Sequence, residues 1–318
     1  MTAGSATSWV TLALVGVAAI WGATFVMVKD AVERYPLYGF LGLRFAIAVV
    51  AFSVLFPRAF ARLDRGTVQV GLLAGGMLTL GYVFQTWGLQ GTTASKAAFI
   101  TGMFVIITPI MQAVLLRRTP RLLTAVGAVL AFIGLWFLSG AGGGGWNDGD
   151  TRVLLCAVAY SAHMIVLGSL GRKHDVGALT LMQLMTVAVV CGAISLATES
   201  PGLPPDSGVW IALGVTGVLA SAIAFWVQTL AQRYISPAKT ALVLILEPVF
   251  GGMFGWLAGE AIGVGGLVGS GLILTGMILA EVVGAAAHPR EGVEFEPSLE
   301  GIPVPVASRL SDTDARDL

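Results

Sequence analysis

Long apolar segments dominate the chain and are separated by short polar loops. Ten of them approach the roughly 20 residues that a helix needs to cross the hydrocarbon core of a bilayer, which is about 30 Å thick. The apolar runs are continuous and do not alternate at every second residue, so they predict helices and not the strands of a membrane barrel. The ten predicted spans are residues 9–28, 37–57, 66–90, 95–116, 122–139, 151–170, 176–197, 208–231, 238–258 and 262–285.

The composition agrees with this interpretation. Hydrophobic residues make up 56% of the 318 residues and charged residues only 11%, whereas about a quarter of a soluble domain is charged. The formal net charge is zero, so the chain lacks the basic field of a nucleic-acid-binding protein. The two cysteines, Cys156 and Cys191, lie inside apolar segments, which argues against a disulfide framework or a cysteine metal site. These features exclude an ordinary cytosolic enzyme, a nucleic-acid binder and a disordered chain.

The charges of the loops predict the orientation in the membrane. The first span is expected to be retained, because residues 1–8 contain no Lys or Arg and no cleavage site of small residues precedes Lys29. With a cytoplasmic N-terminus, the inner loops hold ten Lys and Arg residues and the outer loops hold four. We therefore expect a multi-pass protein of the plasma membrane with both termini cytoplasmic. The glycine-rich segment 140–149 becomes an outer loop, and residues 286–318, acidic and without apolar periodicity, are predicted to be a disordered cytoplasmic tail.

The two halves of the chain resemble each other. Two alignments relate them, and their offsets differ by about one helical turn. The first alignment pairs residues 20–24 with 159–163, Arg44 with Gln183, Thr108-Pro109 with Glu247-Pro248 and Gly127 with Gly266, and the second pairs residues 85–98 with 228–241. Both Gln-Thr pairs and both lysines, Lys96 and Lys239, coincide in the second alignment.

This repeat predicts an inverted topology. Each half contains five predicted spans, an odd number, so the second copy enters the membrane from the opposite side. We expect an all-α membrane protein of ten transmembrane helices, with residues 1–139 and 150–285 forming two inverted five-helix repeats around a central cavity. Two such halves can rock against each other and expose a site at the membrane midplane to each side in turn.

Six short motifs accompany the repeat: Trp21-Gly22-Ala23-Thr24-Phe25, Leu43-Arg44-Phe45, residues 92–100, residues 237–241, residues 246–250 and Gly259-Glu260. Together they resemble the drug/metabolite transporter superfamily, and within it the ten-helix EamA-type carriers. The resemblance covers about residues 10–283. It implies a bundle of five plus five helices with a central cavity and an exporter-like activity on metabolites or amino acids. One motif departs from the family: the Gly-Glu that often follows the proline-containing helix of the first half is here Arg117-Arg118-Thr119-Pro120, which questions a role for an acid in that loop.

Glu247 is the first candidate for function. It is predicted near the centre of the ninth span, where a charge costs at least about 2.5–3.5 kcal/mol and usually faces a cavity or a partner. A buried carboxyl group there could take up and release a proton or bind a cationic substrate. The alternative is a structural acid beside the Pro248 kink, satisfied by an inward lysine or a helix N-terminus.

Other polar residues in the predicted spans give further candidates. Arg44 could bind a substrate carboxylate through its guanidinium fork, or it could extend to the interface or bond helix carbonyls. Lys96 and Lys239 are gate candidates or interfacial anchors. His163 is a candidate proton relay or a hydrogen-bonded core residue. The remaining candidates for the cavity lining are Thr24, Gln85, Gln228 and Trp226, with interhelical packing as the alternative.

The sequence therefore favours a secondary transporter of a small metabolite or amino acid, an exporter, with proton coupling as one option. The expected partners are a small-molecule substrate and the lipid bilayer, and the protein is expected to be a monomer or a homodimer. No catalytic residues, metal or cofactor are expected, because no HExxH, P-loop or GxSxG pattern occurs. The alternative is a multi-pass sensor or an intramembrane enzyme. An enzyme would need converging acid, base or metal-binding residues, and only Glu247 and His163 are available.

Overall fold

The protein is described here by a computed structural model that covers residues 3–115, 122–140, 145–200, 202–235, 240, 243–279, 295–296 and 304–305. These residues are predominantly helical. Two short strands, β1 (Phe295–Glu296) and β2 (Val304–Pro305), pair in an antiparallel manner. They lie within the tail that the sequence predicts to be disordered, and the rest of segment 286–318 is outside the described residues.

The described helices follow the predicted spans. The first half contains α1 (Ala3–Val32), α2 (Leu37–Leu55), η1 (Pro57–Arg62), α3 (Arg65–Leu89), α4 (Ala94–Gly102), α5 (Phe104–Leu115) and α6 (Leu122–Gly140). The second half contains α7 (Asp148–Ser169), η2 (Gly171–Lys173), α8 (Val176–Thr198), α9 (Ser207–Gly217), η3 (Val218–Ile223), α10 (Ala224–Tyr234), α12 (Leu246–Leu257) and α13 (Val264–Ile278). Side chains define several starts, because Asp64, Asn147, Asp175 and Asp206 each accept a hydrogen bond from the backbone amide three residues later.

Seven helices in the described part of the chain are long and apolar enough to cross a membrane. Two further apolar helical stretches, Ala125–Leu138 and Val264–Ile278, are shorter. The predicted span 238–258 is only partly described, with α12 as its well-defined portion. The predicted helical architecture is thus confirmed for the described spans, seven of which are candidate membrane crossings, whereas the count of ten transmembrane helices stays a prediction.

Three predicted spans are less regular than their hydropathy indicates. The span over residues 95–116 is interrupted by a turn at Met103, which separates α4 from α5. In the span over residues 208–231, the wider π-helical turn η3 lies between α9 and α10. In the ninth span, a turn at Ile245 precedes α12. Apolar composition does not record such interruptions, because the side chains remain hydrophobic on both sides of each break.

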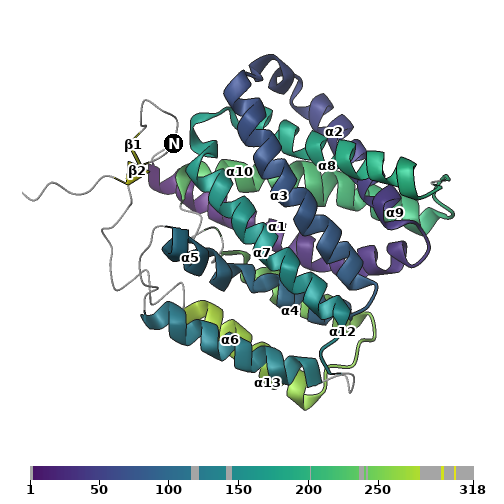
Figure 1. The fold of residues 1–318 in the computed structure, drawn as a ribbon, viewed down its shortest axis with the longest axis vertical. Coiled ribbons are helices and arrows are strands. Elements are labelled where there is room, and N and C mark those ends of the chain that lie inside the picture. Colours follow the sequence, from purple (N-terminus) through teal and green to yellow (C-terminus); the bar gives the residue numbers. More distant parts are fainter. Residues whose placement is uncertain are drawn as a thin grey trace, which may run out of the picture.

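The helices pack in pairs that join the two halves. Figure 1 shows α6 and α13 side by side at one edge of the molecule, with α2 and α8 on the other side of the bundle. A Cβ on Gly134 would lie 2.6 Å from the carbonyl oxygen of Gly269, and a Cβ on Gly276 would collide with the carbonyl oxygen of Gly127. Because the later residue of α13 meets the earlier residue of α6, the two helices run antiparallel. Glycine therefore permits the close approach of these two backbones.

Candidate functional site

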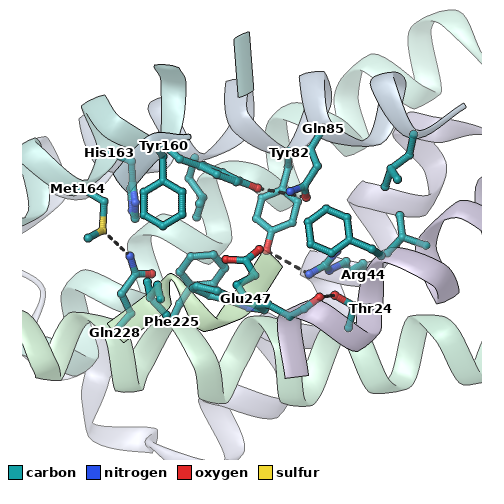
Figure 2. Close-up of a pocket in the computed structure, with 17 residues that line it drawn as sticks. Thr24, Arg44, Tyr82, Gln85, Tyr160, His163, Met164, Phe225, Gln228 and Glu247 are labelled. Atoms are coloured by element: carbon teal, nitrogen blue, oxygen red, sulfur yellow. Dashed lines mark hydrogen bonds between the residues drawn. The ribbon is translucent and has the colours of Figure 1, made fainter. Parts of the chain in front are cut away.

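A cavity lies in the middle of the bundle. Its walls come from both halves of the chain, including α1, α2 and α3 of the first half and α7, α10 and α12 of the second. Figure 2 shows its polar side chains converging from these helices. The polar or ionisable lining residues are Thr24, Arg44, Tyr82, Gln85, Tyr160, His163, Gln228 and Glu247, and the rest are mainly aromatic and aliphatic.

Arg44 is held at the cavity wall by two hydroxyl groups. Its Nε donates to Ser221 Oγ at 3.0 Å and its Nη2 donates to Tyr82 Oη at 3.1 Å. The guanidinium carbon also lies 4.6 Å from the centre of the Tyr82 ring. The side chain is only 2% exposed, and no carboxylate of the described residues forms an ion pair with it. Nη1 has no partner in the described part of the chain and Nη2 has one hydrogen to spare, and free guanidinium donors of this kind suit a carboxylate.

The π-helical segment η3 positions this arginine. Its Ser221 accepts the Arg44 hydrogen bond, and the carbonyl oxygen of the neighbouring Ala220 accepts a hydrogen bond of 2.8 Å from the Trp21 indole. π-helical turns widen the backbone and often occur at functional sites. Both contacts link a helix of the first half to η3 of the second.

Glu247 lines the same cavity from α12. It is 5% exposed and lies in the first turn of that helix, not at the centre of a continuous helix as the sequence predicts. The N-terminus of a helix favours a negative charge. Within the described residues Glu247 has neither a hydrogen-bond donor nor a cationic partner. Figure 2 shows Arg44 and Glu247 directed into one cavity from different walls.

Neutral polar groups complete the lining. Gln85 donates to Thr101 Oγ1 at 3.3 Å and accepts from Tyr160 Oη at 3.4 Å. Gln228 donates to the sulfur of Met164 at 2.9 Å, and its carbonyl oxygen Oε1 is buried without a partner in the described structure. Such an orphaned acceptor is costly unless a ligand or water satisfies it.

The lining is built from matched pairs of the repeat. The first alignment of the halves pairs Trp21 with Tyr160, Thr24 with His163 and Phe25 with Met164, and the second pairs Tyr82 with Phe225 and Gln85 with Gln228. Arg44 and Glu247 break this pattern, since their counterparts are the neutral Gln183 and Thr108. The two walls of the cavity therefore carry counterpart residues at matching positions. At the positions of Arg44 and Glu247, however, only one of the two counterparts is ionisable.

The comparisons with known proteins identify the family. The sequence model of the EamA-like transporter family matches residues 8–140 and again residues 148–281. The chain belongs to this family. A protein named an uncharacterised transporter from Archaeoglobus fulgidus is 31% identical over 243 residues, which cover 76% of each chain. An S-adenosylmethionine/S-adenosylhomocysteine transporter from Chlamydia muridarum is 27% identical over 278 residues, which cover 81% of this chain and 86% of the relative.

The fold agrees with a solved structure as well. A crystal structure of a protein that is 18% identical matches with a TM-score of 0.67 and covers 88% of this chain and 99% of its own. This EamA-like protein is thus a multi-pass membrane transporter of a small-molecule substrate, in accord with its apolar helices. No group of three His, Cys, Asp or Glu residues in the described ranges could hold a metal ion.

Not all predicted site residues of the EamA-like chain meet in the cavity. Thr24, Arg44, Gln85, Gln228 and Glu247 do, and so does His163, whose Nε2 lies 2.7 Å from Oε1 of Gln183. Trp226 is absent from the lining and stacks on Phe56, with ring centres 4.9 Å apart. The face of a helix that meets the cavity depends on its rotation, which the sequence alone does not fix, and here the neighbour Phe225 faces the cavity instead.

The two gate candidates have different outcomes. Lys96 lies away from the central cavity, at the start of α4, and pairs with Asp150 at 2.6 Å. Lys239 lies outside the described residues. Tyr82 and Tyr160 line the cavity but were not among the sequence candidates. The repeat holds the signal for them, since Tyr160 is the counterpart of Trp21 and Tyr82 precedes Gln85 by about one helical turn.

Proposed function

We propose that the protein is a secondary transporter that exports a small dipolar metabolite, such as an amino acid derivative, by alternating access. The observation that carries this proposal is the pair of buried ionisable residues Arg44 and Glu247, one basic and one acidic, which face one cavity without pairing with each other. A charge within a membrane span is costly and normally faces a partner or a pathway. A dipolar substrate would supply both partners at once.

The chemistry of the two sites defines the substrate class. The free guanidinium donors of Arg44 suit a carboxylate, whereas Glu247 suits a cationic group or, in its absence, a proton. The aromatic side chains Trp21, Tyr160 and Phe225 in the lining suit a flat or apolar group between these two ends. S-adenosylmethionine, which the name of the Chlamydia relative includes, has a carboxylate, cationic groups and a flat base, and it is therefore a suitable first probe.

The packing of the helices supports the inverted repeat that alternating access needs. In the repeat, α1 is the counterpart of α7, α3 is that of α9 and α10, and α12 is that of α4 and α5. The contact between α3 and α7 therefore has a counterpart in the contact of α1 with α9 and α10. In the same way, the contact between α1 and α12 corresponds to the contact of α7 with α4 and α5. All of these contacts occur. In the pairs α2–α8 and α6–α13, the two helices are each other's counterparts. In both pairs the helices run antiparallel, as expected when the second copy is inverted.

Two cationic contacts support the same repeat. Lys29 donates to the carbonyl oxygens of Leu89 and Thr92 at the end of α3, at 3.1 and 2.9 Å. Arg172 donates to those of Gln232 and Ile235 at the end of α10, at 3.1 and 3.5 Å. The four carbonyls are counterparts in the second alignment of the halves. Each half therefore neutralises the C-terminus of its own third span in the same way.

The charges of the loops support an orientation with both termini in the cytoplasm of a cell bounded by the plasma membrane. Export would then load substrate from the cytoplasmic side and release it outside. Uptake of a proton by Glu247 from outside would balance the charge of this site after release. This gives Glu247 the coupling role and Arg44 the role of anchoring the substrate.

Transport in proteoliposomes tests the proposal. Radiolabelled S-adenosylmethionine and a set of zwitterionic amino acids serve as probes, with and without an imposed pH gradient. We expect the wild-type protein to concentrate at least one probe when the gradient is present. Glu247→Gln should lose this concentration and retain exchange of internal for external probe, because the site still binds but no longer exchanges a proton.

Arg62→Gln is the matched control, since this arginine is exposed and pairs with Asp175 at 2.7 Å away from the cavity. It should transport like the wild type. Equal transport by wild type, Glu247→Gln and Arg44→Gln for every dipolar probe would refute the proposed roles of both residues. Transport that merely equilibrates the probe with or without the gradient would instead identify a facilitator.

A further inference from the structure

Two carboxylates tie the halves together at one end of the bundle, the end that holds the N-termini of α2 and α4 and is here named the α2 end. Glu199 follows α8 of the second half and accepts hydrogen bonds from the backbone amides of Tyr38 and Gly39 in α2, at 3.0 and 2.8 Å. Glu260 follows α12 of the second half and accepts from Ala94 and Ser95 in α4, at 2.7 and 2.8 Å. Each carboxylate thus caps a helix of the other half.

A third acid reinforces the same end. Asp150 is fully buried at the start of α7 and binds Lys96 Nζ at 2.6 Å and Thr92 Oγ1 at 2.7 Å. The start of α4 is therefore held by two acids of the second half, Asp150 and Glu260. Opening this end would break all of these charge-assisted hydrogen bonds together.

In the sequence, these two capping acids have no acidic counterpart in the first half. In the first alignment of the halves, the counterpart of Glu199 is Phe60 and that of Glu260 is Arg121, and neither can accept hydrogen bonds from backbone amides through its side chain. The N-terminus of α2 corresponds to the N-terminus of α8 in the repeat. The N-terminus of α8 is capped by a residue of its own half, because Asp175 accepts a hydrogen bond of 3.0 Å from the backbone amide of Ala178. The N-cap of α2 is Pro36, which provides no side-chain hydrogen bond, so this helix depends on Glu199.

We propose that Glu199 and Glu260 form a latch that keeps the α2 end closed and makes this closed state the resting state of the empty carrier. The inference rests on the proposed alternating access. Separation of the halves at the α2 end removes the acceptors of two helix N-termini. Separation at the opposite end breaks the Arg62–Asp175 ion pair and the Thr67–His174 contact but leaves the cap of α8 intact. The latch biases the carrier toward loading from the end opposite to α2, which is the cytoplasmic end in the orientation proposed above.

Distance measurements between spin labels test the latch without any substrate. Labels at Glu33 of α1 and Leu203 of the loop before α9, both exposed, report the α2 end in a background of Cys156→Ala and Cys191→Ala. Labels at Arg58 and Lys173, exposed as well, report the opposite end. We expect the combined Glu199→Gln and Glu260→Gln substitutions to raise the ratio of open to closed carrier at the α2 end about tenfold, because the caps of two helices are weakened.

Asp64→Asn is the matched control, because Asp64 caps its own helix α3 at the opposite end, 2.7 Å from the amide of Thr67. It should leave the α2 end closed. Ser195→Ala is a milder variant that removes only the hydroxyl 2.8 Å from the Glu199 carboxylate, and it should shift the distances in the same direction as the double variant. Unchanged distances at the α2 end in the double variant and in Ser195→Ala would refute the latch.

A reversible crosslink separates failure of the latch from failure of the proposed function. A Cβ on Gly39 would lie 3.3 Å from Ser195 Oγ, so Gly39→Cys with Ser195→Cys can form a disulfide between the halves. Oxidation should abolish transport of the probes used above, and reduction should restore it. Blocked transport without a shift of the spin-label distances would refute the latch and support alternating access, whereas unimpaired transport by the oxidised protein would refute both.

Discussion

At the scale of single residues, the central cavity combines an arginine and a carboxyl group that the protein itself does not pair with each other. Arg44 has hydroxyl partners but no carboxylate among the described residues, and Glu247 has no partner there. A buried charge without a counter-ion lowers stability. Sites that bind a charged ligand commonly retain such an unfavourable arrangement, because the ligand completes it.

This trade-off gives a prediction for Arg44→Gln, which introduces the residue found at the repeat counterpart Gln183. We expect the variant to be as stable as the wild type or more stable by about 1 kcal/mol, because glutamine can keep a hydrogen bond to Ser221 or Tyr82 without a buried charge. Transport of dipolar probes should be lost. Thermal unfolding in detergent and proteoliposome flux measure the two effects.

A large loss of stability in Arg44→Gln, with the melting temperature falling far below that of the wild type, would indicate a structural role for the arginine. The control Arg62→Gln, at an exposed position, should change neither quantity.

The loop residue Asp206 gives a prediction for pH. The backbone amide of Val209 and the guanidinium of Arg34, 2.5 Å away, hold the pKa of Asp206 below its ordinary value of 3.8. Because the pKa is lower in the folded protein, the unfolded state binds more protons as the pH falls below the ordinary value. The stabilisation is complete above that pH and is lost as the pH falls through the folded pKa.

We therefore expect the melting temperature in detergent to fall with acidification below about pH 4, and Asp206→Asn to reduce the slope. An unchanged slope in this variant would show that other carboxylates control the acid sensitivity.

The sequence located the charged site residues better than the aromatic ones. Arg44 and Glu247 are rare charges inside apolar spans, and this cost alone marked them as candidates. Trp226 belongs to a helix with many apolar residues, where burial against Phe56 is as favourable as a place in the cavity. The choice between these environments depends on the π-helical turn η3, which changes the rotation of α10 and leaves no trace in the hydrophobic pattern.

At the scale of elements, hydropathy predicted the existence of the spans but not their interruptions. Phe104, the first residue of α5, offers a carbonyl that accepts side-chain hydrogen bonds from Thr108 and from Ser161 of α7, at 2.6 and 3.2 Å. The interrupted regions at Met103 and Ile245 both border the cavity, through Phe104 and Leu244. Discontinuous helices of this kind often form the binding sites of transporters.

The contact between α6 and α13 gives a prediction at this scale. A Cβ on Gly269 would lie 2.5 Å from the carbonyl oxygen of Gly134, whereas one on Gly271 of the same helix has no atom within 4 Å. We expect Gly269→Ala to lower stability by about 1–3 kcal/mol because it forces the two backbones apart. Gly271→Ala, the control, should be neutral or slightly stabilising because alanine favours the helix.

Thermal unfolding of the two variants in the same detergent measures the difference. Equal melting temperatures would show that the close contact of α6 and α13 contributes little, and would contradict the packing role of these glycines.

At the scale of the whole molecule, the two halves contribute counterpart residues to one cavity and differ in charge. The sequence repeat predicted the matched halves, and the paired lining residues and the two cationic helix caps accord with it. The carboxylates Glu199 and Glu260 could not be assigned from the sequence, because their partners are backbone amides, which any residue provides. Such asymmetry is what allows a carrier built from two similar halves to favour one of its two orientations.

The inverted arrangement also makes a prediction about sidedness. Arg34 and Lys173 are counterparts in the first alignment of the halves, so an inverted repeat places them on opposite sides of the membrane, while a repeat in the same direction places them on the same side. Glu33→Cys, beside Arg34 and exposed, and Lys173→Cys serve as single reporters in the background without Cys156 and Cys191. In intact cells, an impermeant maleimide should label position 33 and should reach position 173 only after permeabilisation, because the cytoplasmic loops carry most of the positive charge. Labelling of both positions from outside would contradict the inversion, and the reverse pattern would keep the inversion but place the α2 end, with its latch, in the cytoplasm.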